Sequence, residues 1–430
     1  MEYLLFVCYL VFFAWLITKI GFYRAAGLSK SQLIIFFLLK IIAGIFYGWI
    51  GIYYGGLAQM WDTWGYHQNG ILEYQLLFHN PHEYFTNLFH NPYKDGITQF
   101  LNTSDSYWND LKGNVFIKIL SVFNIFSFGN YYVNVIFLAF ITFLGPLAFF
   151  RVMTDAFPNR KLLIMLGSFL VPSFLYWTSG IHKEGLIFTG IALIIYCVYF
   201  AVKERRLGAK RIAGLIVGFL LVLTLRNFII IILVPAVIAW LVAMWQNRRS
   251  FLVYSIMYLI FILIFFNAKY INPIFDFPLA VVDKQKEFLK LEGGSSIILN
   301  SKLEPTATSF LKNSFEAISL SALRPYPTDV KHILSLAASI EVFVLLFLFA
   351  IFLFFRKKRE GSSPLFWFCI FFSISMLLTI GFSVNNLGAI VRYRSIILPL
   401  LVVPLAALTD WAKIKIIFTN IIKKYNMIKY

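Results

Sequence analysis

Long apolar runs recur along this 430-residue chain, from MEYLLFVCYLVFFAWL at one end to SIILPLLVVPLAAL near the other. Crossing a hydrocarbon core about 30 Å thick takes about 20 apolar residues in a helix, and a helix satisfies its own backbone hydrogen bonds. Charged residues make up only 13% of the chain, so few of them interrupt these runs. The sequence therefore predicts an all-α polytopic membrane protein, with a single transmembrane domain over 1–430.

We expect about eleven membrane-spanning helices. The first has neither a basic n-region nor a small-residue cleavage site, and we interpret it as a retained span rather than a signal peptide. The stretch 114–129 is apolar but short and contains Lys118, which indicates a helix lying along the membrane interface. The expected spans are 3–18, 32–55, 130–150, 162–178, 186–202, 212–225, 228–245, 251–267, 336–355, 364–381 and 394–409.

The charge of the connecting segments alternates along the chain. One set holds 22 Lys and Arg against 4 Asp and Glu, and the other holds 15 against 14. Since cytoplasmic connections carry the excess of Lys and Arg, the first set is predicted to be cytoplasmic. The N-terminus is then outside a bacterial plasma membrane and the C-terminus inside. The first set comprises 19–30, 151–161, 203–211, 247–249, 356–360 and 410–430, and the second comprises 56–129, 179–185, 226–227, 268–335 and 382–394.

The net charge of +18 follows from this topology, so we predict no nucleic-acid partner. Two long polar segments, 56–129 and 268–335, face outside. They are expected to form short interfacial helices packed on the bundle rather than independent domains. Any chemistry is therefore expected on the extracytoplasmic side.

The first outer loop opens with WDTWGYHQ (61–68), which places Asp62 among aromatic residues beside the expected end of a span. Three interpretations compete: an ordinary interfacial loop, a carbohydrate-binding surface and a catalytic base. Aromatic packing and partial loss of water are expected to raise the pKa of Asp62 toward that of a usable base. Aromatic faces and carboxylates also suit a sugar, which offers apolar C–H faces and many hydroxyls.

The same loop holds four histidines, His67, His79, His82 and His90. Their spacings fit no compact metal-ligand motif, and no Asp-x-Asp pair is present to hold a divalent ion beside a phosphate. We therefore predict no metal site and no cofactor, while a divalent ion in the reaction is left open.

The turn TSGIHKEG (178–185) joins two expected spans on the outer side. The next span runs inward, so its N-terminal N–H groups and positive dipole end face outward. Lys183 beside His182 is unfavourable at such an end unless an anion binds, and a phosphate held by N–H groups and the ammonium is one explanation. Glu184 as a built-in counter-charge is the other.

Further cations are expected at the outer mouth. Arg392 and Arg394 crowd the N-terminus of the last span, and only one should face the bundle because they are two residues apart on a helix. Arg226 lies at the outer tip of the 212–245 hairpin, and Arg324 lies just before the ninth span. This pattern favours an anionic ligand that enters from the membrane, such as a lipid phosphate.

The stretches WDTWGYHQ, PSFLYWTSGIHKEG and VRYRSIILP resemble sequences of the GT-C superfamily, especially of Bacteroidetes-type proteins of polysaccharide and glycolipid assembly. The resemblance covers most of the chain from the second span onward. It implies a membrane glycosyltransferase that takes a sugar from a polyprenyl-phosphate carrier and passes it to a glycan or glycolipid acceptor. Asp62 is followed by Thr63 and Trp64 rather than by a second aspartate, which points to metal-independent members.

The resemblance also implies residue roles. Asp62 would be the general base that deprotonates the acceptor hydroxyl, with inversion at the anomeric carbon. Outer cations would stabilise the leaving phosphate in a water-poor site, and side chains of the first loop would line the sugar. The phosphate-binding set is His182, Lys183, Arg226, Arg324, Arg392 and Arg394, and the sugar-binding set is Trp61, Trp64, Tyr66, His67 and Glu73.

Three rival functions are kept. A polysaccharide polymerase or ligase uses lipid-linked sugars as both donor and acceptor, and only Asp62 argues against it. A flippase for a lipid-linked oligosaccharide should carry charged residues deep in its spans, where this sequence has little besides Lys40. A non-catalytic membrane scaffold is the third.

Overall fold

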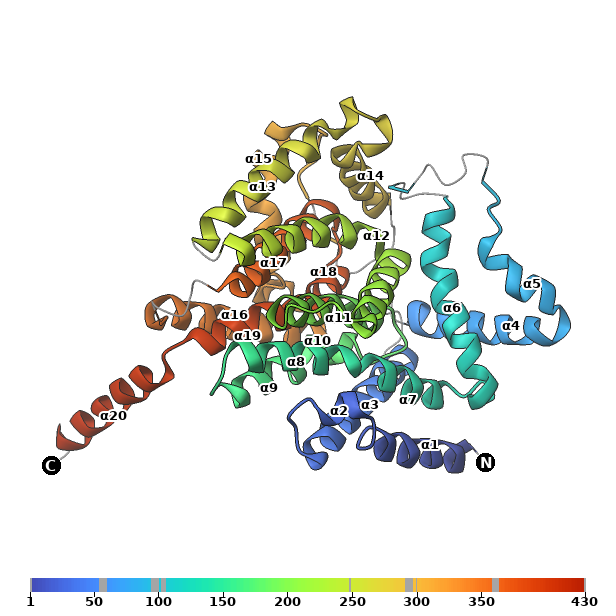
Figure 1. Ribbon diagram of the computed structural model, residues 1–430, viewed down its shortest axis with the longest axis horizontal. Helices are drawn as coiled ribbons and strands as arrows, with labels where there is room; N and C mark the ends of the chain where they lie inside the picture. Colours follow the sequence, from blue (N-terminus) through green and yellow to red (C-terminus); the bar gives the residue numbers. More distant parts are fainter. Residues whose placement is uncertain are drawn as a thin grey trace.

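The protein is helical throughout the part of the chain that the computed structural model describes. The described residues are 2–53, 60–93, 100–101, 106–246, 249–290, 297–298, 300–357 and 363–428, and within them there is no strand, only two isolated β-bridges. Figure 1 shows a central bundle, with α4 (Gly65–His79) and α6 (Tyr107–Ser127) at one end and α20 (Trp411–Ile428) projecting from the other. The expectation of an all-α membrane protein is confirmed.

Seven helices of the described chain are long and apolar enough to cross a membrane, so the expected count of eleven is not confirmed. Helices α7 and α8 run on as one such unit over Tyr131–Ala156. The seven are α3 (Lys30–Tyr53), α7 (Tyr131–Thr142) with α8 (Leu144–Ala156), α11 (Glu184–Lys203), α12 (Ala209–Gln246), α13 (Ser250–Asn267, continuing to Tyr270), α16 (Ile333–Phe355) and α17 (Pro364–Ser383).

The remaining expected spans are short, broken or merged. Helix α1 (Glu2–Leu16) has only 15 residues. The run 162–178 is divided into α9 (Lys161–Phe169) and α10 (Pro172–Trp177), because Pro172 has no N–H to continue a helix and starts a new one instead. Helices α18 (Leu387–Ser395) and α19 (Leu398–Leu408) bend by 57° and count as an eighth span only if taken together.

The two expected spans 212–225 and 228–245 both lie within the 38 residues of α12. Arg226 leaves the helical region there, with φ −160° and ψ 77°, and divides the element in two. The break therefore places Arg226 at the junction of two apolar helical segments, where the sequence predicts the tip between two spans.

The two polar outer segments form short helices packed on the bundle. The first contains α4, α5 (Pro81–Thr86) and α6, and the buried face of α6 packs along α4 and α12. The second contains α14 (Phe277–Lys290) and α15 (Ala307–Ile318), both of which pack against α17. A Cβ at Gly381 of α17 would overlap the backbone carbonyl of Ala317, so this glycine permits the close approach of α15.

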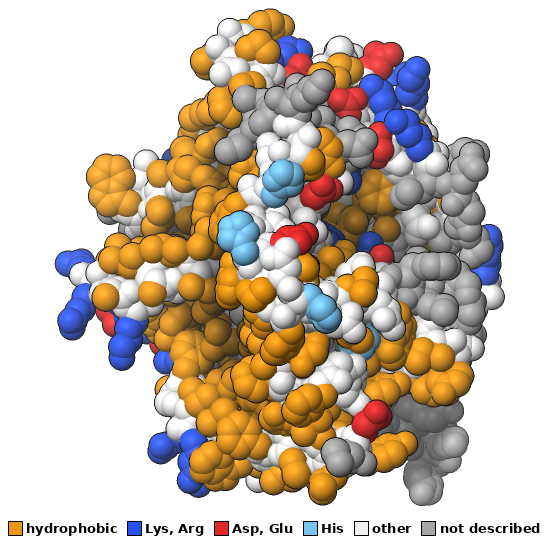
Figure 2. Space-filling view, turned by 90° about the vertical axis from the view of Figure 1, so that its right-hand side faces the viewer, with side chains coloured by type: hydrophobic (Ala, Val, Ile, Leu, Met, Phe, Trp, Pro, Cys, Tyr) orange, Lys and Arg blue, Asp and Glu red, His pale blue; other side chains and the backbone are white. Residues whose placement is uncertain are grey.

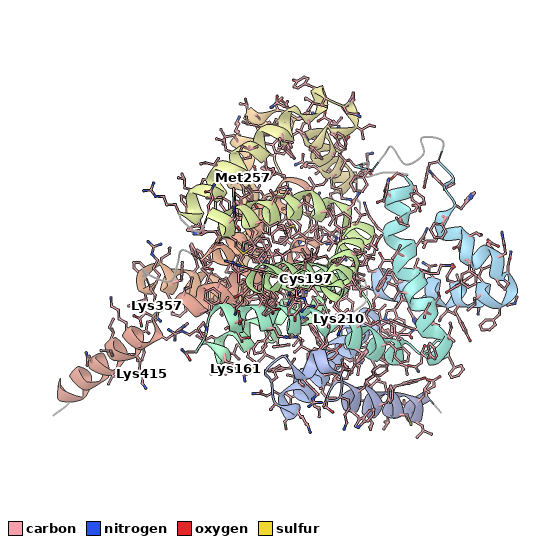
Figure 3. All side chains as sticks on the ribbon, in the orientation of Figure 1. Lys161, Cys197, Lys210, Met257, Lys357 and Lys415 are labelled. Atoms are coloured by element: carbon pink, nitrogen blue, oxygen red, sulfur yellow. The ribbon has the colours of Figure 1, made fainter. Side chains whose placement is uncertain are left out.

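Helix α13 shows how the bundle meets lipid. It is almost entirely apolar, yet only Ser250, Val253 and Tyr254 are buried. A continuous exposed apolar surface of this kind indicates contact with membrane lipid. Figure 3 shows Lys161, Lys357 and Lys415 at the end of the molecule where α20 projects.

Candidate functional site

Five charged or titratable side chains from four parts of the chain meet in one network, which we call the charged cluster: Asp62, His182, Glu184, Arg226 and Arg392. Arg392 Nη1 donates to the Asp62 carboxylate and lies 3.2 Å from His182 Nε2. His182 Nε2 lies 3.5 Å from Asp62, and its Nδ1 contacts Glu184. Arg226 Nη2 donates to Glu184 at 2.9 Å, and Arg392 Nε lies 3.7 Å from the same carboxylate.

Asp62 is positioned by a π-helical turn, Met60–Trp64, that leads into α4. Two neighbours anchor this turn. The Thr63 hydroxyl hydrogen-bonds the Tyr131 hydroxyl at 2.7 Å, and Trp64 Nε1 donates to the Gly48 carbonyl at 3.1 Å. The turn is thereby fixed to α3 and α7, so the Asp62 carboxylate is held on a rigid support. Such turns recur at functional sites in helical proteins.

The turn between α10 and α11 supplies His182, Lys183 and Glu184. Lys40, buried in α3, donates to the Thr178 carbonyl at 2.7 Å and fixes the start of the turn. The turn closes tightly, since a Cβ at Gly185 would lie 2.5 Å from the Thr178 oxygen. Lys183 is the N-cap residue of α11, as expected, and Glu184 is fully buried in its first turn.

Of the two arginines of the cluster, Arg226 lies where the sequence suggested and Arg392 does not. Arg226 lies at the break within α12, where its side chain turns toward α11. Arg392 and Arg394 lie in the last turn of α18. The expectation that they crowd a helix N-terminus is therefore wrong, and the negative end of the α18 dipole makes this location favourable for cations.

The pKa of Asp62 moves opposite to the expectation. Burial alone would raise it, but the charge of Arg392 and the hydrogen bonds from His182 and Arg392 outweigh burial and hold the pKa well below its ordinary value. The expected raised pKa is thus wrong, because the sequence does not reveal that Arg392 is in contact. Asp62 is ionised at neutral pH, with 35% of its side chain exposed.

His182 joins the two carboxylates of the cluster. Burial lowers the pKa of His182 to about 4 despite its hydrogen bond with Asp62, so the imidazole is neutral near pH 7. Each of the two neutral tautomers of His182 is compatible with two of the contacts that its ring makes. In one, Nδ1–H donates to Glu184 and Nε2 accepts from Arg392. In the other, Nε2–H points to Asp62 and Nδ1 accepts from the Lys183 N–H at 3.0 Å.

Lys183 extends the cluster toward the first outer loop. Its Nζ lies 4.8 Å from the centroid of the Tyr66 ring, and that ring packs 6.0 Å from the His182 ring. Burial and then the charge of Arg226 lower the pKa of Lys183 to about 7, while Asp62 opposes the shift. Glu184 is thus the counter-charge of Arg226 and, at 3.7 Å, of Arg392, and no ion pair joins it to Lys183 in the described structure.

Two residues of the expected phosphate-binding set have other partners. Arg394 is buried and donates to the backbone carbonyls of Ser321, Ala322 and Arg324. Arg324 pairs with Asp329 at 3.4 Å. Arg394 thus fastens the turn after α15 to α18. As expected from their spacing, Arg392 and Arg394 point in different directions.

Among the described side chains of the expected sugar-binding set, only Tyr66 lies against the charged cluster. Trp64 stacks on Tyr131 with centroids 4.0 Å apart, and His67 is buried beside the same ring. Glu73 pairs with Lys118 and accepts from Asn87 at 2.9 Å, which ties α4 to α6. The side chain of Trp61 lies outside the described residues.

Tyr393 lies beside the cluster and was not expected. The Tyr393 ring lies 4.0 Å from Arg226 Cζ and 5.2 Å from Arg392 Cζ.

Within the described chain no group of three His, Cys, Asp or Glu side chains is arranged to hold a metal. Figure 2 shows the face that α4 and α5 help to form, where histidine, acidic and basic side chains gather among apolar ones.

Comparison with known proteins adds no relative to this description. A scan against protein-family models, a search of curated proteins and a search of solved structures each gave no match.

Proposed function

We propose that this protein is a membrane glycosyltransferase, similar to the GT-C superfamily, that acts on the extracytoplasmic face. It moves a sugar from a polyprenyl-phosphate carrier to a glycan or glycolipid acceptor. The observation that carries the proposal is the convergence of Asp62 with Lys183, Arg226 and Arg392, which come from four distant segments. A fixed carboxylate beside several fixed cations is what sugar transfer from a phosphate requires.

The roles follow from the contacts. Asp62 accepts a hydrogen bond from the acceptor hydroxyl, which attacks the anomeric carbon. The bond from that carbon to the phosphate oxygen breaks, and its electron pair leaves with the lipid phosphate. Arg392, Arg226 and Lys183 stabilise this charge in a site largely screened from water.

The low pKa of Asp62 sets the timing of proton transfer. A weakly basic carboxylate takes the proton only when the new C–O bond is well advanced and the attacking hydroxyl has become strongly acidic. The two tautomers of His182 offer a path onward from Asp62 toward Glu184. Tyr66 presents an aromatic face next to Lys183 on which an apolar sugar face can pack.

The buried charges inside the bundle give no support to a transporter. Lys40 is held by Thr178, and Glu341 accepts from the Ser173 backbone at 2.7 Å and from its hydroxyl at 2.6 Å. Both therefore have fixed structural partners rather than lining a route. A polymerase or ligase of lipid-linked sugars is the alternative to be separated by experiment.

The test is sugar transfer in a deletion strain complemented with wild type, Asp62→Asn or Asp110→Asn at matched membrane levels. Asp110 is the matched control, since it is an aspartate of the same outer loop that accepts a bond from Tyr93 at 2.8 Å. We expect Asp62→Asn to lower a defined lipid-linked or surface glycan about 100-fold or more, measured by mass spectrometry, and Asp110→Asn to match wild type. Normal glycans from Asp62→Asn would refute the proposal, and accumulation of single repeat units would assign a polymerase.

A further inference from the structure

A chain of aromatic contacts links Lys284 of α14 to the two arginines of the charged cluster. Its Nζ is 5.3 Å from the Phe288 ring centroid, and the Phe288 ring packs 6.4 Å from Tyr393. Tyr393 in turn contacts Arg226 and Arg392. The second outer segment thus brings a third cation to this side of the site.

Lys112 lies on α6, which packs against the helix that carries Arg226. Burial and then the positive charges of Lys284 and Arg226 lower the pKa of Lys112 to about 8. Arg226, Arg392 and Lys112 likewise lower the pKa of Lys183. Five cations from five helices, α6, α11, α12, α14 and α18, therefore face one region.

This region carries more positive charge than its own carboxylates neutralise. Lys112, Lys183 and Lys284 have no hydrogen-bond acceptor or ion pair among the described residues. Arg226 is 9% exposed, and its Nη1 and the Nε of Arg392 are buried without a hydrogen-bond partner among them. Asp62 and Glu184 are the two carboxylates paired with these cations, while the nearby Glu287 pairs with Lys290, which leaves a formal excess of three positive charges. Unpaired donors and half-buried lysines grouped in this way favour an anionic ligand.

We propose that the anion bound here is a diphosphate, the head group of a lipid-diphosphate-linked sugar, and that Lys112 and Lys284 hold its second phosphate. This inference rests on the proposed transferase function and specifies its donor. A sugar linked through one phosphate carries one negative charge and leaves a lipid phosphate with two. A sugar linked through two phosphates carries two and leaves a lipid diphosphate with up to three, which balances the excess.

Sugar transfer from this donor is balanced without a further reactant. The acceptor oxygen forms a bond to the anomeric carbon, and the bond from that carbon to the nearer phosphate breaks. Its electron pair stays on the lipid diphosphate, and the hydroxyl proton passes to Asp62. Lys112 and Lys284 bind the charge that the second phosphate contributes, and they take no part in the proton transfer.

The test compares farnesyl diphosphate and farnesyl monophosphate as ligands of the full-length protein in detergent, by isothermal titration calorimetry. We expect the diphosphate to bind at least tenfold more tightly to wild type. Lys112→Ala and Lys284→Ala should each weaken diphosphate binding about tenfold and leave monophosphate binding within twofold. Lys286→Ala is the matched control, because Lys286 shares α14 but is exposed and paired with Asp283 at 2.8 Å.

The outcomes separate this inference from the proposed function. Equal affinity for the two ligands, with Lys112→Ala and Lys284→Ala unchanged, would overturn the diphosphate while leaving a monophosphate donor. Binding of neither ligand, together with normal glycans from Asp62→Asn, would overturn both. Uridine diphosphate binding as tightly as farnesyl diphosphate would keep the diphosphate site but assign it to a nucleotide donor instead of a lipid.

Discussion

Asp62 and Glu73 are acidic residues of the same outer loop, yet their ion pairs serve different purposes. Glu73 and its partner Lys118 are 16% and 19% exposed, and Lys118 also bonds Asn87 at 3.0 Å and the Tyr84 carbonyl. All of these partners belong to the loop itself. Asp62 instead reaches Arg392, 330 residues away, and keeps 35% of its side chain exposed. The Glu73–Lys118 pair stabilises the loop, and the Asp62–Arg392 pair leaves part of the Asp62 carboxylate accessible to a ligand.

Glu73→Ala should therefore destabilise the protein without a specific effect on anion binding. Removing one partner of this half-buried pair leaves the Lys118 ammonium without its carboxylate, and we expect a cost of about 2 kcal/mol. The measurement is thermal unfolding in detergent, followed by farnesyl diphosphate titration below the transition. Glu83→Ala, at an exposed carboxylate bonded to Asn80, is the control and should unfold like wild type. A Glu73→Ala protein as stable as the control would contradict the supporting role.

Anion affinity should fall as the pH rises from about 7 to 9. The pKa values of Lys183 and Lys112 are lowered to about 7 and 8, and a bound phosphate raises both because it favours the ammonium form. Binding thus takes up protons above these values, so affinity is highest below pH 7 and is lost as the lysines of the free protein deprotonate. The measurement is farnesyl diphosphate titration at several pH values in two buffers of different ionisation enthalpy.

Lys183→Arg is the matched variant for that titration. A guanidinium stays charged throughout this range, so the decline between pH 7 and 8 should shrink. The groups facing Lys183, namely Asp62, Arg226, Arg392 and Lys112, are unchanged in the variant. An unaltered pH profile would show that Lys183 does not contact the anion.

At the scale of elements, helix junctions decide which side chains meet. Helices α15 and α17 approach so closely at Gly381 that a Cβ there would overlap the Ala317 backbone. Their contact leads directly into the turn that Arg394 fastens to α18, and Arg392 lies on that same short helix. The position of Arg392 therefore depends on a junction that carries no charge.

Gly381→Ala should separate α15 from α17 and lower stability by about 1–3 kcal/mol, the usual range for overpacking a tight contact. Transfer activity should fall with it, because α18 shifts with its support. Gly113→Ala is the control, since a Cβ at this helical glycine of α6 meets nothing within 4 Å. Thermal unfolding and the glycan assay on both variants check this. If Gly381→Ala were as stable as wild type, the contact between α15 and α17 would accommodate the extra Cβ with no loss in the free energy of unfolding.

The sequence identified elements better than the junctions between them. Asp62, His182, Lys183, Arg226 and Arg392 stand out because charged residues beside apolar runs are rare. Lys112 and Lys284 do not, since nothing in the spacing separates Lys284 from the exposed Lys286 and Lys290 of the same helix. The bend before α19 and the location of Arg392 depend on tertiary contacts, which periodicity does not report.

At the scale of the whole molecule, the excess of Lys and Arg and the charged cluster are expected on opposite sides of the membrane. Lys161 and Lys415, from segments expected to be cytoplasmic, lie at the end where α20 projects, and α4 to α6 lie at the other end (Figures 1 and 3). Lys210, from another segment expected to be cytoplasmic, lies near the middle of Figure 3, so the expected topology, with the first outer loop facing away from the cytoplasm, stays a prediction.

Single cysteines test this orientation in a Cys8→Ser background, which removes the one exposed native cysteine among three. We expect His82→Cys, at an exposed position of α5, to react in intact cells with a maleimide that cannot cross the membrane. Lys415→Cys should react only after the membrane is opened. The reverse pattern would place the charged cluster on the cytoplasmic side and refute an extracytoplasmic transferase.

The contact between Asp62 and Arg392 also determines when, during synthesis of the chain, the charged cluster can be completed. Glu184 and Arg226 are 42 residues apart and can pair while the chain is still being made. Asp62 can pair only after Arg392, 330 residues later, has been synthesised. At the usual 5–20 residues per second this takes roughly 15–65 s. A chain that ends before α18 therefore lacks Arg392, and its charged cluster stays incomplete.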